Sequence, residues 1–131
     1  MNDRKIVDYR EAEFVRFVAA DEVIAALVDE AKGETWTRGQ EFALLVIAEG
    51  RRSLVAGGRD GIEFRIDSDG RPVVTIDDVD HEVAELVWHT HPRATGPSDF
   101  DYELLRILHQ DFSVVHEITG VPGCTLFRRK R

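Results

Sequence analysis

The 131-residue sequence has a single cysteine, Cys124, and lacks any apolar run long enough to cross a bilayer. One cysteine excludes an internal disulfide and a cysteine-based zinc cluster, and a reducing compartment suits such a chain. A membrane span needs about 20 apolar residues. The first residues, MNDRKIVDYREAE, are charged and contain no apolar core of the kind a secretory signal has. These absences predict a cytoplasmic protein.

Basic residues are also scarce. The chain carries 17 Lys and Arg against 25 Asp and Glu, which gives a formal net charge of -8. Phosphate-rich partners are repelled by such a surface, so nucleic acid and anionic membranes are disfavoured as partners. The one basic stretch is RRKR at residues 128–131, and we interpret it as a solvated chain end.

The length suits one domain over residues 1–131, because a chain of this size buries one core. Apolar residues at helical spacing predict a helix over residues 21–32, with Asp21 capping its start and Gly33 following its end. A second apolar stripe predicts a helix from Ser98 to about Gln110. The stripe residues are Ile24, Leu27, Val28 and Ala31 in the first helix, and Phe100, Leu104, Ile107 and Leu108 in the second.

The rest of the chain is rich in strand patterns. The segment EFALLVIAE at residues 41–49 is almost continuously apolar, which is typical of a strand covered on both faces. Asp69-Gly70 is a hairpin signal between GIEFRI and PVVTI. We therefore expect an α+β domain with a single mixed, mostly antiparallel β-sheet flanked by helices. The other expected strands are 14–18, 53–56, 61–66, 83–89, 113–118 and 124–128.

One stretch, WHTHPRATGPSDFD at residues 88–101, suggests chemistry. Alternate residues of a strand point to the same face, so His89 and His91 project together while Thr90 points away. Imidazole nitrogens suit zinc, and Asp101 in the first turn of the next helix can add an oxygen ligand. Three protein ligands plus water predict an open, catalytic type of zinc site.

The run His89-Thr90-His91-Pro92, followed by Ser98-x-x-Asp101, resembles the JAMM motif of the JAB/MPN metalloprotease family. The resemblance implies the JAB/MPN, cytidine-deaminase-like architecture and Zn²⁺ as the cofactor. It also implies that the two histidines and the aspartate are the metal ligands.

The family also has a catalytic glutamate before an apolar strand, and Glu41 is the best match to it. Leu44 stands where the family usually has glycine, so Glu34 and Glu49 remain alternatives for the base. If the resemblance holds, zinc lowers the pKa of a water molecule to roughly 7. Glu41 then takes the proton of this water and passes it to the leaving amine, while the Ser98 hydroxyl donates to the oxyanion.

The resemblance predicts a zinc-dependent peptidase or isopeptidase. Its implied substrate is a polypeptide, with ubiquitin-like and sulfur-carrier proteins among the family's substrates. Two alternatives stay open at this point. One is a partner-binding module of the same fold that does not hydrolyse, and the other is a RadC-like protein associated with nucleic acid, which the net charge disfavours.

Several residues of this region also have plain structural interpretations. Ser98 can cap the second helix whatever else it does, and Asp99 is expected to be exposed in the first turn. We expect Trp88 in the core. The remaining residues weighed as minor candidates are His81 in a solvated acidic loop, His109 near a helix end, His116 on a strand, and Arg93 and Thr95 in the loop before Ser98.

Overall fold

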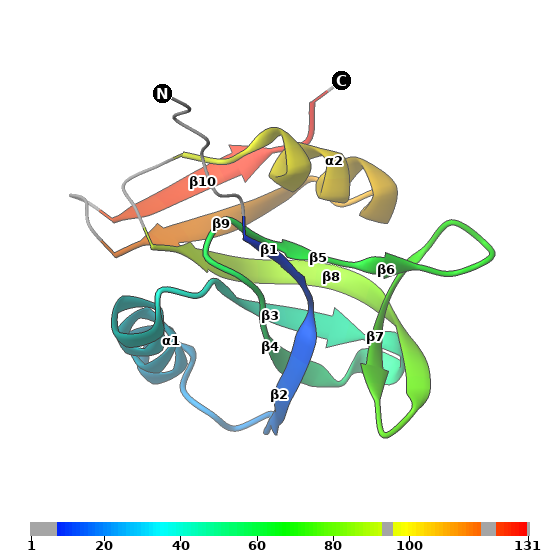
Figure 1. The fold of residues 1–131 in the computed structure, drawn as a ribbon, viewed down its shortest axis with the longest axis horizontal. Coiled ribbons are helices and arrows are strands. Elements are labelled where there is room, and N and C mark those ends of the chain that lie inside the picture. Colours follow the sequence, from blue (N-terminus) through cyan, green and yellow to red (C-terminus); the bar gives the residue numbers. More distant parts are fainter. Residues whose placement is uncertain (1–7, 93–95, 119–122, 131) are drawn as a thin grey trace, which may run out of the picture.

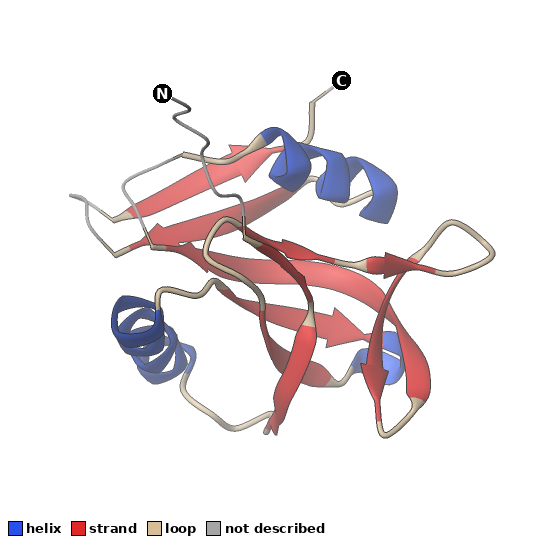
Figure 2. Ribbon diagram, viewed as in Figure 1, coloured by secondary structure: helices blue, strands red, loops and turns tan. Residues whose placement is uncertain are grey.

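The computed structural model describes residues 8–92, 96–118 and 123–130, and these residues form an α+β fold (Figures 1 and 2). Within them, no helix is long and apolar enough to cross a membrane. In chain order the elements are β1 (Tyr9–Glu11), β2 (Glu13–Val18), α1 (Ile24–Arg38), β3 (Phe42–Ile47), the 3-10 turn η1 (Ala48–Gly50), β4 (Arg52–Ala56), β5 (Gly61–Glu63), β6 (Arg65–Ile66), β7 (Pro72–Ile76), β8 (Val79–His91), α2 (Asp99–Leu108), β9 (Phe112–Glu117) and β10 (Cys124–Arg128).

The main sheet has the strand order β10-β9-β8-β3-β4-β2, with β7 pairing to β8 and β6 to β7. Strands β8 and β9 are parallel, and the other pairs of this sheet in the described residues are antiparallel. The expected α+β class and the mostly antiparallel, mixed sheet are therefore confirmed.

The expectation of a single sheet is wrong, because β1 and β5 form a separate parallel pair. The turn before β5 explains this arrangement. A Cβ atom on Gly58 would lie 2.1 Å from the Asp8 carbonyl oxygen, and one on Gly57 would lie 2.4 Å from Ile62 Cγ1. Gly58 thus lets the N-terminal segment approach this turn, and Gly57 lets the turn close onto β5.

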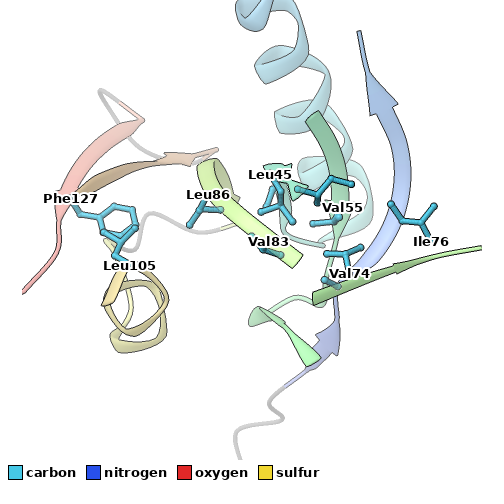
Figure 3. Packing of buried hydrophobic residues seen from close by; sticks show 11 residues of the cluster. Leu45, Val55, Val74, Ile76, Val83, Leu86, Leu105 and Phe127 are labelled. Carbon is cyan, nitrogen blue, oxygen red and sulfur yellow. The ribbon is translucent and has the colours of Figure 1, made fainter. Parts of the chain in front are cut away.

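Strand β8 is 13 residues long and organises the fold. It pairs with β7 near its start, with β3 along its middle and with β9 at its end. Strand β7 also contacts β2, so the sheet curls around a core. Figure 3 shows this core, with Leu105 of α2 and Phe127 of β10 packed together at one end of it. The other labelled members are Leu45, Val55, Val74, Ile76, Val83 and Leu86.

A second core lies on the other face of the sheet, under α1. Leu27 and Ala31 of α1 belong to the same cluster as Leu44 and Trp88 of the sheet. Trp88 is 3% exposed, which confirms its expected place in the core. Because side chains alternate along β8, the histidine that follows Trp88 faces the opposite side, toward α2.

The first helix differs from the prediction at both ends. It begins at Ile24 with no side-chain cap, so Asp21 does not cap it, and it continues through Gly33 to Arg38. Gly39, with φ 66°, ends the helix in the left-handed conformation. A glycine inside a helix costs about 1 kcal/mol relative to alanine. Packing of the buried stripe on both sides of Gly33 outweighs that cost; the stripe is Leu27, Ala31 and Thr35.

Strand boundaries also shift. Strand β3 is shorter than the predicted 41–49, and the predicted 61–66 strand is split into β5 and β6. Strand β8 begins at Val79, so His81 lies in a strand and the predicted solvated loop is wrong. The cause is the two-residue turn Asp77-Asp78, whose φ angles of 51° and 65° suit a tight hairpin between β7 and β8. The second helix, β9 and β10 lie close to the predicted positions.

Candidate metal centre

The two histidines occupy the end of β8, where β9 supports the strand. His89 pairs with Val115 and His91 with Glu117 across this parallel ladder. His89 and His91 are 3% and 5% exposed as whole residues, and their Nε2 atoms lie 3.1 Å apart. Among the described residues, the buried Nδ1 of His89 has no hydrogen-bond partner. Nε2 is therefore the nitrogen through which this ring makes its polar contacts.

Asp101 reaches the same point from the first turn of α2. Ser98 starts this helix with a reciprocal cap, in which the Ser98 N–H donates to Asp101 Oδ2 at 2.8 Å and the Asp101 N–H donates to Ser98 Oγ at 3.3 Å. The cap holds the Asp101 carboxylate, with Oδ1 3.1 Å from His89 Nε2 and Oδ2 3.4 Å from His91 Nε2. The reciprocal cap of Ser98 and Asp101 thus both starts the helix and orients the Asp101 carboxylate toward the histidines.

These donors fit a divalent metal ion. Ligands about 2.0–2.1 Å from a tetrahedral zinc ion lie about 3.3 Å from one another. The two imidazole nitrogens lie 3.1 Å apart, and each faces its own oxygen of the Asp101 carboxylate, Oδ1 at 3.1 Å from His89 and Oδ2 at 3.4 Å from His91, so the two nitrogens and the carboxylate group form a triangle. The chemical types also agree, since zinc takes imidazole nitrogen and carboxylate oxygen. In addition, ligand atoms of Glu41, His89 and His91 all lie within 4.8 Å of one another.

Glu41 stands beside this triangle, immediately before β3. Its N–H donates to the Gly58 carbonyl at 2.9 Å, and its carbonyl accepts from the Gly57 N–H at 2.8 Å. Its carboxylate oxygen Oε1 lies 3.9 Å from His91 Nε2, and the residue is 6% exposed. The carboxylate is near the histidines but farther from them than Asp101 is.

The two carboxylates have opposite pKa shifts. Burial raises the pKa of Glu41 to about 8, although the charge of His91 partly opposes the shift. Burial also acts to raise the pKa of Asp101, but hydrogen bonds from His89 and His91 outweigh it and hold this pKa well below its usual range. Two neighbouring carboxylates with separated pKa values are typical of an acid–base site, one binding a proton and the other staying ionised.

The other glutamates considered as the base lie elsewhere. Glu34 is half-buried on α1, not in the predicted loop, and its carboxylate pairs with Arg38 at 2.7 Å. Glu49 lies in η1, beyond the opposite end of β3, with φ 73°. Of these three candidates, the structure brings Glu41 to the histidines.

The minor candidates do not join the site. His116 lies on the α1 side of the sheet, where its ring packs edge-on against Trp88 at 5.7 Å, and burial with nearby Lys32 lowers its pKa. Asp99 is exposed, as expected, and His109 ends α2 in the left-handed conformation. Arg93 and Thr95 lie outside the described residues.

Comparison of the chain with protein-family models, curated proteins and solved structures finds no match. The chemistry of the site is therefore inferred from its own residues and distances.

A cleft of about 660 Å³ leads to this centre, and its walls were not predicted from the sequence. It is lined by Glu41, His89, His91, Ser98 and Asp101 at the candidate metal centre. Apolar side chains of the β5–β6 segment and of α2 form much of the remainder; they are Ile62, Phe64, Ile66, Phe100, Leu104 and Ile107. Their convergence depends on the position of β5 outside the main sheet, which no local pattern indicated.

Proposed function

We propose that the protein is a zinc-dependent hydrolase of the JAMM type that cleaves a peptide or isopeptide bond. The triangle of His89, His91 and Asp101, with edges of 3.1 to 3.4 Å and Glu41 beside it, carries the proposal. A buried structural ion would need four protein ligands. Three ligands at the end of an open cleft suit an ion that also contacts water and substrate.

Each residue has a defined role in this proposal. His89, His91 and Asp101 hold the ion, which when bound supplies an acidified water molecule and polarises the scissile carbonyl. Glu41 accepts a proton and returns it to the leaving amine, since its carboxylate is buried beside the histidines and lines the cleft. Ser98 lines the cleft, and its hydroxyl hydrogen is available for the substrate oxyanion while Oγ accepts from Asp101.

The lining of the cleft supports a polypeptide substrate. Its apolar walls offer a place for a bulky apolar side chain next to the cleaved bond. Asp60, Glu63 and Glu103 add negative charge, against one cation, Arg59, among the lining residues that the structure describes. This charge repels phosphate groups and favours neutral or basic flanking residues, which disfavours nucleic acid as the substrate.

The apolar lining of the cleft predicts that Ile66→Asp raises KM most for substrates with a bulky apolar residue beside the cleaved bond. Ile66 lines the cleft and is 50% exposed, so its replacement is tolerated by the fold. We expect KM to rise about tenfold for peptides with leucine beside the cleaved bond, because one apolar contact is lost. Peptides with alanine there should change less. Val79→Asp is the matched control, since Val79 is 56% exposed on β8 and does not line the cleft. Equal effects of both substitutions would contradict a role of the cleft in binding.

Metal analysis combined with hydrolysis assays tests the proposed function. Protein purified without added metal should contain about one zinc ion per chain. It should cleave a member of a panel of linear peptides and of proteins linked through a C-terminus to a lysine side chain. A chelator should abolish cleavage, and zinc should restore it. Stoichiometric zinc without cleavage of any panel member would instead indicate a binding module.

A further inference from the structure

A buried pair of threonine hydroxyls lies behind the two histidines. Thr90 separates His89 from His91, so its side chain points to the opposite face of β8, toward α1. Its Oγ1 lies 2.7 Å from Oγ1 of Thr35, and both residues are 0% exposed. Buried hydroxyls are retained in proteins when their hydrogen-bonding capacity is satisfied.

The Thr90 hydroxyl also takes the place of a backbone hydrogen-bonding partner for β3. The β3–β8 ladder ends at the Ala43–His89 pair, and the next residue of β3 is Phe42. The Phe42 N–H donates to Thr90 Oγ1 at 2.9 Å, and Oγ1 donates to the Phe42 carbonyl at 3.4 Å. If Thr35 donates to Thr90, the Thr90 hydroxyl accepts two hydrogen bonds and donates one, which uses its full capacity.

These bonds connect the base to the histidines by a short path. Phe42 directly follows Glu41 in the chain, and Thr90 lies between the two ligating histidines. Thr35 lies near the end of α1, where its carbonyl accepts the capping N–H of Gly39 at 2.8 Å. The elements α1, β3 and β8, which each carry or support part of the site, therefore meet at the Thr90 hydroxyl group.

We propose that Thr35 is a positioning residue, which holds the Thr90 hydroxyl so that it sets the separation between the Glu41 carboxylate and the histidine pair. Without the Thr35 hydroxyl, the Thr90 side chain can rotate about χ1, and the Phe42 N–H loses its fixed acceptor. The start of β3 then moves relative to β8, and Glu41 moves with it. The expected effect on turnover rests on the proposed function, whereas the effect on the Phe42 hydrogen bond does not.

The test uses Thr35→Val, which removes the hydroxyl at nearly constant volume, and Thr35→Ser, which keeps it. Thr37→Val is the matched control, because Thr37 is exposed on the same helix and bonds only the Gly33 carbonyl at 2.9 Å in the described structure. Two measurements are made: exchange of the Phe42 amide hydrogen in the metal-free protein by NMR, and kcat and KM of the zinc-loaded enzyme on the cleaved panel substrate.

We expect Thr35→Val to speed Phe42 amide exchange at least tenfold relative to Thr37→Val, and to lower kcat roughly 10- to 100-fold with KM within twofold. Thr35→Ser should restore both. Thr35→Val that lowers the melting temperature while leaving Phe42 exchange equal to that of Thr37→Val would overturn the inference. If no panel substrate is cleaved by the native protein, the proposed function fails, and Phe42 exchange alone still decides whether Thr35 positions this segment.

Discussion

Replacing Glu41 by glutamine is expected to lower kcat by roughly 10²- to 10⁴-fold while zinc remains bound. Glutamine fills the same space but cannot accept a proton, and in the proposed site the ion is held by His89, His91 and Asp101. Zinc content measured beside kcat separates the loss of a base from the loss of a ligand. Glu34→Gln and Glu49→Gln are the controls, because both residues lie away from the centre in the structure.

The same variant has an expected effect on stability that does not depend on catalysis. The buried Glu41 carboxyl has its pKa raised from 4.5 to about 8, so the folded, metal-free protein binds more protons than the unfolded chain between these values. The contribution of the Glu41 carboxyl to stability is therefore fully present below pH 4.5 and is lost as the pH rises toward 8. Glu41→Gln removes this dependence, and the variant should become more stable than the native protein as the pH rises.

Two outcomes would contradict this role of Glu41. Unchanged kcat with bound zinc would show that another group accepts the proton. Loss of zinc in Glu41→Gln would show that Glu41 is itself a metal ligand. This is the main competing arrangement, because the Glu41 carboxylate lies only 3.9 Å from His91 Nε2. Chemical denaturation of the metal-free native and variant proteins from pH 5 to 9 measures the linked effect on stability.

Removal of a histidine ligand should abolish stabilisation by zinc. A zinc concentration 100-fold above Kd stabilises a native protein by about 2.7 kcal/mol, because the ion binds the folded state. His89→Ala removes one of the three proposed metal ligands, so added zinc should leave the melting temperature of this variant nearly unchanged. Thermal unfolding at matched zinc concentrations, together with elemental analysis, measures the effect.

His116→Ala is the control for this variant. His116 is a partly buried histidine of the neighbouring strand, but it lies on the α1 side of the sheet against Trp88. It should keep the response to zinc even if its overall stability changes. If His89→Ala and His116→Ala respond to zinc as the native protein does, the histidine pair is not the metal centre.

The part of the centre carried by β8 and α2 could be predicted because it depends on short-range rules. Strand alternation places His89 and His91 on one face whatever the strand packs against. The Ser98 cap positions Asp101 three residues later, within the same helical turn.

The length of α1 could not be predicted in the same way. Local propensity favours an end at Gly33, and the packing of Thr35 against β8 carries the helix beyond it. The last turns of this helix are stabilised by contacts with a distant strand. Such stabilisation cannot be predicted from the sequence of the helix alone. The Thr35–Thr90 contact joins residues 55 positions apart and had no local signal.

The amino-acid sequence alone therefore determined the histidine pair, its carboxylate partner and the α+β class, since these follow from side-chain periodicity and capping over a few residues. Only the tertiary structure decided which glutamate stands at the centre and where the cleft runs. Glu41 lies near His91 because Gly57 and Gly58, in the loop after β4, hydrogen-bond to its backbone. The cleft exists because β5 pairs with β1 outside the main sheet. Both depend on pairing between segments far apart in the chain, which no short pattern records.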